Sequence, residues 1–141
     1  MKLLAWAIVS LGLLTVASSP ASAQGTQQAD RVELRQNYPN PFNPETTIPF
    51  RLPEALFSGG KRPVVSLRVY NVLAQLVAVP ILQGSGEPLA NLQLDWNGTG
   101  EYSAYWDGKV LNSDREAASG VYVYQLVVNG ERHTGKMTIV K

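Results

Sequence analysis

Short stretches in which apolar and polar residues alternate recur along the chain from residue 48 onward. Alternation with a period of two is typical of strands that bury one face. These stretches lie at 48–52, 65–69, 75–82, 92–96, 102–106, 120–128 and 136–141, with Gly, Pro, Asn and Asp between them. Beyond residue 23 no segment sustains a helical period. The pattern predicts an all-β fold with seven strands arranged as an antiparallel β-sandwich.

Two local signals refine this pattern. The stretch 120–128 is the strongest predicted strand, and Asn129-Gly130 follows it directly. Because Asn-Gly favours a two-residue type I′ turn, the last two strands are expected to form an antiparallel hairpin. Pro80 lies inside the stretch 75–82 and lacks a backbone N–H. We therefore expect an edge strand, or the end of a strand, at this proline.

The N-terminal residues have a different pattern. A short positive start, Met1-Lys2, precedes a mostly apolar run, and Ala21-Ser22-Ala23 is a small-x-small cleavage sequence. This layout predicts a helical secretory signal peptide over residues 1–23, cleaved after Ala23. The apolar run is too short for a retained transmembrane helix. Residues 24–36 are polar and predict a flexible leader, and residues 37–141 form the predicted domain. The product is expected to be exported, with no transmembrane segment after cleavage.

Composition narrows the function classes. The chain carries 12 Lys+Arg and 11 Asp+Glu, a formal net charge of +1. This balance does not predict nucleic-acid binding, which requires a basic stripe or a high pI. The chain has no Cys and one His, His133, expected to be an ordinary exposed strand residue. Acidic residues in the loop 107–116 do not match a calcium-loop spacing, and a polar turn is favoured over a calcium site. We expect no catalytic residues, cofactor, metal or small-molecule substrate.

The segment 37–44, Asn-Tyr-Pro-Asn-Pro-Phe-Asn-Pro, is the most specific motif. Its three prolines restrict the backbone, so the segment is a stiff strap that cannot pair as an inner strand. Phe42 is the large apolar side chain that the strap holds. It is expected to plug one end of the sandwich; direct recognition by a partner is a compatible alternative. The aromatic residues on alternating strands are expected to pack in the core rather than to form a carbohydrate platform.

The strap followed by Thr46-Thr47-Ile48 resembles the opening of type A C-terminal sorting domains of the type IX (Por) secretion system. The resemblance continues in Val69–Gln75, Tyr105–Gly108, Ala118–Leu126 and Lys136–Lys141. It implies an Ig-like β-sandwich, similar also to the Ig-like domain of flagellar hook-capping proteins. Where that family usually carries Gly after the Tyr70-Asn71 pair, this chain has Ala74. If the position requires positive φ, Ala costs about 1 kcal/mol relative to Gly.

The resemblance also implies a function. Such domains direct exported cargo to an outer-membrane translocon, and a sortase can then attach the cargo to the cell surface. The terminal strand and its last lysine are important for recognition in that family. Mapped onto this chain, the partner-recognition hypothesis names residues in the strap and in the terminal strand: Asn40, Pro41, Phe42, Asn43, Pro44, Lys136, Met137 and Lys141. The expected partner is the outer-membrane secretion and sorting machinery, and the expected location runs from the periplasm to the outer-membrane surface or the exterior.

Two alternatives stay open. Only Gln24 to Gln36 lie between the predicted cleavage site and the strap, whereas the sorting domains normally follow a sizeable cargo. The chain is therefore alternatively a stand-alone structural or adhesive Ig-like secreted protein, or a fragment separated from its cargo.

Overall fold

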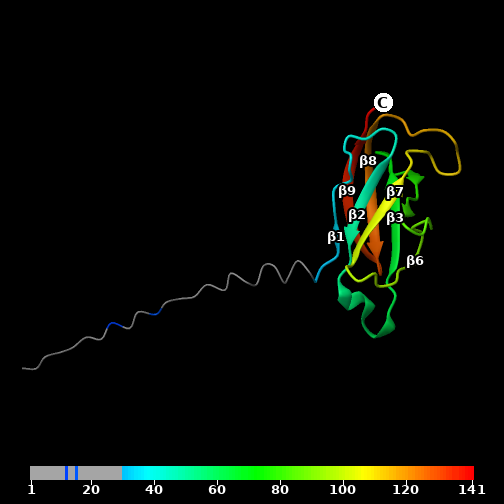
Figure 1. Cartoon of the computed structure of the whole chain (residues 1–141). Helices are drawn as coiled ribbons and strands as arrows, with labels where there is room; N and C mark the ends of the chain where they lie inside the picture. The colour runs from blue at the N-terminus through cyan, green and yellow to red at the C-terminus, as the bar shows by residue number, and fades with distance from the viewer. Residues whose placement is uncertain (1–11, 13–14, 16–29) are drawn as a thin grey trace, which may run out of the picture.

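The computed structural model of the protein describes Gly12, Thr15 and residues 30–141. The predicted signal peptide, with Ala21 and Ala23 at its cleavage sequence, lies outside the described range 30–141. The residues of that range form an all-β fold of two antiparallel sheets (Figure 1). One short 3-10 segment, η1 (Glu54–Gly60), lies between the second and third strands.

The two sheets divide the strands as follows. Sheet A has the order β1-β2-β7-β5, with bounds β1 (Glu33–Leu34), β2 (Thr46–Arg51), β7 (Glu101–Trp106) and β5 (Ile81–Leu82). Sheet B has the order β4-β3-β8-β9, with bounds β4 (Leu76–Ala78), β3 (Val64–Tyr70), β8 (Gly120–Val128) and β9 (Glu131–Ile139). The two-residue strand β6 (Leu92–Gln93) also pairs with β3. All strand pairs in both sheets are antiparallel.

The strand count differs from the sequence prediction. The described residues contain nine strands, three of them only two residues long, instead of seven. The stretch 75–82 splits at Val79-Pro80, so β4 joins sheet B and β5 joins sheet A. Proline cannot donate to a ladder, and the chain changes sheets there. The stretch 92–96 forms a strand at only two residues, and the last strand begins at Glu131 rather than at residue 136.

The expectation of a flexible leader over residues 24–36 is wrong for its last residues. Glu33 and Leu34 form β1 and pair with Arg51 and Phe50 of β2. The Arg35 N–H continues this pairing by donating to the Pro49 carbonyl at 3.0 Å. A two-residue strand has no readable period, and its pairing comes from the tertiary structure. The folded unit therefore includes residues before the strap.

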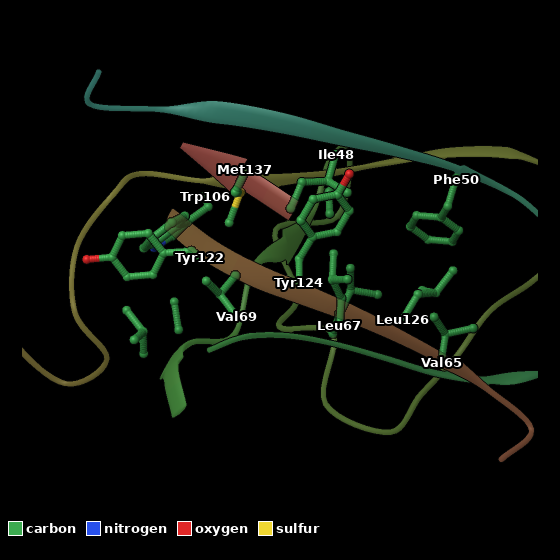
Figure 2. Packing of buried hydrophobic residues seen from close by; sticks show 14 of the residues in the cluster. Ile48, Phe50, Val65, Leu67, Val69, Trp106, Tyr122, Tyr124, Leu126 and Met137 are labelled. Carbon is green, nitrogen blue, oxygen red and sulfur yellow. The ribbon is translucent and has the colours of Figure 1, made fainter. Parts of the chain in front are cut away.

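The core fills the space between the two sheets (Figure 2). Each sheet contributes the apolar residues of its alternating strands, such as Ile48 and Phe50 from sheet A and Leu67, Tyr124 and Leu126 from sheet B; these five side chains are at most 1% exposed. The expected packing role is confirmed for Trp106, Tyr122 and Tyr124, which are buried, whereas Trp96 is 36% exposed and Tyr102 and Tyr105 are partly buried. Burial of one face of each sheet is the main stabilising contribution to a fold of this kind.

One contact in the core crosses the edge of sheet B. Tyr124 pairs with Gly135 of β9, and a Cβ at residue 135 would overlap the Tyr124 ring. The absence of a side chain lets the ring lie across β9, where the Tyr124 hydroxyl donates to the Arg35 carbonyl at 2.9 Å. This hydrogen bond joins sheet B to the residue that follows β1. The glycine is therefore required by a close approach of an aromatic side chain.

The two tight turns of sheet B differ in how well their residues suit their conformations. Asn129 and Gly130 both have positive φ, at 47° and 85°, as a type I′ turn requires, and they join β8 directly to β9. Ala74, in the β3–β4 turn, has a φ of 60°. That position therefore does require the left-handed region, which Ala occupies at a cost.

Candidate functional site

The proline strap, residues 37–44, begins at a buried polar side chain. Asn37 is 2% exposed, and its Nδ2 donates to the Pro39 carbonyl at 3.2 Å and to the Thr46 hydroxyl at 3.1 Å. The Thr46 hydroxyl in turn donates to the Pro39 carbonyl at 3.2 Å. Because buried polar groups must be satisfied, this network fixes the start of the strap against the first residue of β2.

The middle of the strap supplies a plug for the sandwich. Phe42 is 2% exposed and packs edge-on against Trp106, with ring centroids 5.6 Å apart. Trp106 makes a similar edge contact with Tyr122 at 5.9 Å. The structure thus places Phe42 in the core, as the packing interpretation of the sequence predicts. A partner can reach the Phe42 side chain only by displacing it.

The strap and the terminal strand, which are far apart in sequence, lie side by side. The Phe42 N–H donates to the Thr138 carbonyl at 3.0 Å, and the Val140 N–H donates to the Phe42 carbonyl at 3.1 Å. These two bonds form a parallel bridge between Phe42 and Ile139. The Thr138 N–H also donates to the Asn40 side-chain oxygen at 3.1 Å. The strap therefore covers the second half of the outer edge of β9 (Figure 1).

The three terminal-strand residues of the hypothesis have different environments. Met137 is 1% exposed and belongs to the core. Lys136 is exposed, while its carbonyl accepts from the Gln36 side chain at 2.9 Å. Lys141 is exposed and its ammonium lies 3.3 Å from a Glu116 carboxylate oxygen, while its N–H donates to the Ser119 hydroxyl. Only the two lysines present charged side chains that a partner could bind.

The remaining strap residues form the outer surface of this site. Asn40, Pro41, Asn43 and Pro44 are exposed. The Pro44 carbonyl lies against Gly108, whose φ is 81° and where an added Cβ would overlap that oxygen. The strap end is therefore seated on the Asp107-Gly108 turn. We use the name strap–β9 site for the strap together with Lys136–Lys141.

Next to this site, a tyrosine is hydrogen-bonded to a carboxylate. The Tyr105 hydroxyl on the outer face of sheet A donates to the Glu45 carboxylate. This bond raises the pKa of the Tyr105 hydroxyl above its ordinary value, because it stabilises the protonated phenol. The negative charges of Glu45 and of the nearby Asp107 also raise the pKa of Tyr105. The hydrogen bond anchors Glu45, the residue after the strap, to sheet A.

Sequence reasoning named the strap and the terminal strand separately and missed their contact. It also missed Gln36, Glu116 and Ser119, which hold Lys136 and Lys141 in place. No local pattern pairs residues that lie 22 or more positions apart, so these contacts had no readable signal. One clue was available: a terminal strand with an alternating pattern needs a cover for its free edge.

The loop 107–116 forms a polar turn in which the carboxylates of Asp107 and Glu116 contact other protein groups. Asp107 accepts from the Lys109 N–H at 2.9 Å, and Glu116 pairs with Lys141. The Val110 N–H donates to the Arg115 carbonyl at 2.8 Å, which closes the turn. Within residues 30–141, no group of three or more His, Asp or Glu side chains lies close enough to hold a metal ion.

His133 differs from the sequence expectation of an exposed strand residue. Its side chain is 22% exposed, and its Nε2 lies 3.3 Å from a Glu131 carboxylate oxygen. Within the described range this Nε2 makes no hydrogen bond. His133 lies in the first half of β9, on the inner side of sheet B, at the end of the molecule opposite the strap. His133 therefore packs as a partly buried residue of sheet B and is not part of the strap–β9 site.

Comparisons with known proteins add little to this geometry. Neither a scan against protein-family models nor a search of curated proteins finds a match. A solved structure that is similar is the Pseudomonas fluorescens alkylpurine DNA glycosylase bound to DNA containing an abasic site analogue, at 11% identity and a TM-score of 0.46. The match covers 79% of this chain and 31% of the glycosylase. At this TM-score the likeness carries no argument about fold or function. In the part of the chain described here, no helix has the length and apolar character needed to span a membrane.

Proposed function

We propose that the protein is a non-enzymatic sorting module with an Ig-like β-sandwich, exported after removal of its signal peptide and recognised by a type IX-like secretion machinery. The strap–β9 site is the proposed recognition surface. The supporting observation is that the motif residues 37–44 and 136–141 form one continuous surface through main-chain hydrogen bonds. Two segments that carry the family resemblance therefore meet in space.

The proposed recognition uses the exposed part of this surface. Lys136 and Lys141 supply positive charge at the rim of the strap, and Asn40 and Asn43 supply hydrogen-bonding groups. Phe42 and Met137 are buried and act by holding the two segments in place. A cationic rim beside a rigid polar strap suits a partner surface that carries carboxylates. The buried residues set the geometry, and the exposed residues make the contacts.

The test is a fusion that separates recognition from folding. Residues 30–141 are placed behind a signal peptide and a fluorescent reporter, in a bacterium that has the type IX machinery. The fusion includes residues 30–36 because β1 and Arg35 belong to the folded unit. Surface display of the reporter is measured by protease accessibility on intact cells. Sorting predicts that the reporter reaches the surface.

Point variants are sharper than deletion of 136–141, because deletion also removes the core residues Met137 and Ile139. Lys136→Ala and Lys141→Ala are expected to reduce surface display at least several-fold while the purified domain keeps its thermal stability. Lys61→Ala is the matched control, an exposed lysine in the loop after η1. A reporter retained in the periplasm by every fusion favours the alternative, a structural or adhesive secreted protein. Display that both lysine variants leave unchanged removes the strap–β9 site from the proposal.

A further inference from the structure

The outer face of sheet B has an uneven distribution of charge. Alternate residues of β3, β8 and β9 point away from the core, as their burial patterns and registers show. Among these outward residues the charged ones are Arg68, Arg132 and Lys136, and none is Asp or Glu. None of these three cations forms an ion pair with another of the described residues. The face is therefore cationic without internal compensation.

The outer face of sheet A is different. Arg51 lies opposite Glu101 and Glu33 in the strand register, and Arg35 pairs with both carboxylates at 3.3 and 3.5 Å. This face therefore carries charges of both signs, and both of the named carboxylates pair with Arg35. Residues 30–141 contain equal numbers of acidic and basic side chains, so the imbalance is a property of one face rather than of the whole domain.

A groove of about 320 Å³ opens on the cationic face. It is lined by residues of the β3–β4 turn and of β8: Tyr70, Asn71, Val72, Ala74, Val123 and Gln125. The strand register places Lys136 beside Val123 and Arg68 beside Gln125, so one cation flanks the groove on each side. Val72 is 75% exposed at the rim. The groove is thus lined by both apolar and polar side chains, and a cation lies on each side of it.

Two polar groups in the groove have unused hydrogen-bonding capacity. Within the described part of the chain, neither the Tyr70 hydroxyl nor the Gln125 amide makes a hydrogen bond with another protein group. A side-chain amide can donate to and accept from a peptide unit, and a phenol can do the same. By contrast, the Asn71 amide is occupied in the turn, where it bonds to Gln75 and to the Leu73 N–H.

We propose that this face docks an acidic polypeptide segment of a partner protein. One apolar side chain of the segment enters the groove beside Val72 and Val123, and carboxylates on either side of it meet Arg68 and Lys136. The Gln125 amide bonds to the segment's main chain. Charge complementarity selects the partner, and the groove fixes its position. This inference goes beyond the proposed function and does not depend on it, and the two surfaces share Lys136.

The shape and charge of the face favour a polypeptide over two other occupants. A groove that receives a side chain, with an amide at its floor, suits a peptide better than the flat, fluid surface of a lipid bilayer. A second copy that presented the same face would bring like charges together, which opposes association. Both of these occupants are measured as outcomes of the test.

The probe is a short fluorescent peptide in which Glu alternates with Leu and Ser, and its matched control carries Gln in place of Glu. Binding to the full chain is measured by fluorescence anisotropy at low and at high salt. The Glu peptide is expected to bind at least tenfold more tightly than the Gln peptide, and added salt is expected to weaken it. Arg68→Glu is expected to lower affinity about tenfold, and Val72→Ser several-fold. Lys61→Glu, a charge reversal at the opposite end, is expected to change nothing.

These variants keep the two proposals apart. Arg68 and Val72 lie outside the strap–β9 site, and both are accessible enough that substitution leaves the core intact. Equal binding of the Glu and Gln peptides, or an unchanged affinity in Arg68→Glu, overturns the proposal. So does stronger binding to phosphatidylcholine vesicles containing one third phosphatidylglycerol, or self-association through this face in sedimentation. Loss of surface display without loss of peptide binding bears on the proposed function alone.

Discussion

The two ends of the sandwich are both closed by aromatic side chains, but they are closed in different ways. At the strap end, Phe42, Trp106 and Tyr122 form a chain of edge contacts, and Phe42 and Trp106 are at most 3% exposed. At the opposite end, Phe57 of η1 packs against Trp96 and Tyr102. Phe57 is 9% exposed and Trp96 is 36% exposed. The strap end is therefore the more completely sealed.

The difference lies in what holds each plug. Phe57 is carried by a segment that immediately follows β2, so its position is largely local. Phe42 is carried by a segment that bonds to β9 near the other end of the sequence. Its position depends on the terminal strand, and the terminal strand depends on it for a covered edge. The strap end couples distant parts of the chain, and substitutions there are expected to act on both.

The largest expected effect is the loss of the strap plug. Phe42→Ala removes a fully buried ring and leaves a cavity beside Trp106, so we expect the free energy of unfolding to fall by about 4 kcal/mol. Phe57→Ala should cost clearly less, because its site is partly open to solvent and can collapse. Urea unfolding followed by Trp fluorescence measures both. Equal costs would show that the two ends are equally sealed.

A second comparison tests the seat of the strap on the Asp107-Gly108 turn. Gly108→Ala places a methyl group on the Pro44 carbonyl at a φ of 81°, so strain and overlap add, and we expect a loss of about 3 kcal/mol. Gly98→Ala is the matched control at the opposite end: its φ is 91°, but no atom lies within 4 Å of the added Cβ. It should cost only about 1 kcal/mol, from the backbone alone. Similar melting temperatures for the two variants would contradict a tight strap seat.

High pH should lower the stability that tyrosines at both ends of the sandwich contribute to the fold. Burial raises the pKa of Tyr122 at the strap end and of Tyr102 at the opposite end above the ordinary value of 10.0. The unfolded chain therefore loses these protons first as the pH rises, and the free energy of unfolding falls above about pH 10. Below that pH the contribution is fully present. Tyr122→Phe and Tyr102→Phe should each make this fall shallower, as measured by urea unfolding between neutral pH and about pH 11. A steeper fall in either variant would contradict the attribution of this pH dependence to Tyr122 and Tyr102.

The smallest expected effect is an increase in stability, from a substitution in the β3–β4 turn. Ala74→Gly relieves the positive φ of 60° in the β3–β4 turn, although glycine also raises the entropy of the unfolded chain. We expect a net stabilisation of about 0.5–1 kcal/mol, seen as a slightly higher melting temperature. The Gln75 N–H lies in this turn and donates to the Asn71 side chain. If the substitution stabilises the turn, hydrogen exchange at the Gln75 N–H should become slower. An unchanged or lower melting temperature would remove the strained-turn explanation.

The sequence predicted those parts of the fold that local chemistry determines. The β8–β9 hairpin follows from the strand pattern of 120–128 and from Asn129-Gly130. The positive φ of Ala74 was expected only on the condition that the family's usual glycine marks a left-handed position, and the structure shows that φ. The burial of Phe42 was expected because three prolines exclude its segment from the sheet interior. For the hairpin the decisive interaction lies within a few residues, whereas the observed seat of Phe42 also depends on the distant Trp106 and on β9.

The remaining features depend on residues that are distant in the sequence. β1 exists because β2 offers an edge, and a pair such as Glu33-Leu34 has no period of its own. The bonds from Phe42 to Thr138 and Val140, and the reach of Tyr124 over Gly135 to Arg35, join segments that only the folded chain brings together. The cationic outer face appears only when the register aligns Arg68, Arg132 and Lys136 on neighbouring strands.

The parallel direction of the bridge between Phe42 and Ile139 has a mechanical consequence. Tension applied to the chain before residue 37 and at Lys141 would pull the strap and β9 in opposite directions along a common axis. The two main-chain bonds at Phe42 would then carry the load together, in shear, instead of opening one after the other. Because β1 also pairs with β2, a domain tethered at these two points should resist extension through the β1–β2 pairing and the strap bonds together.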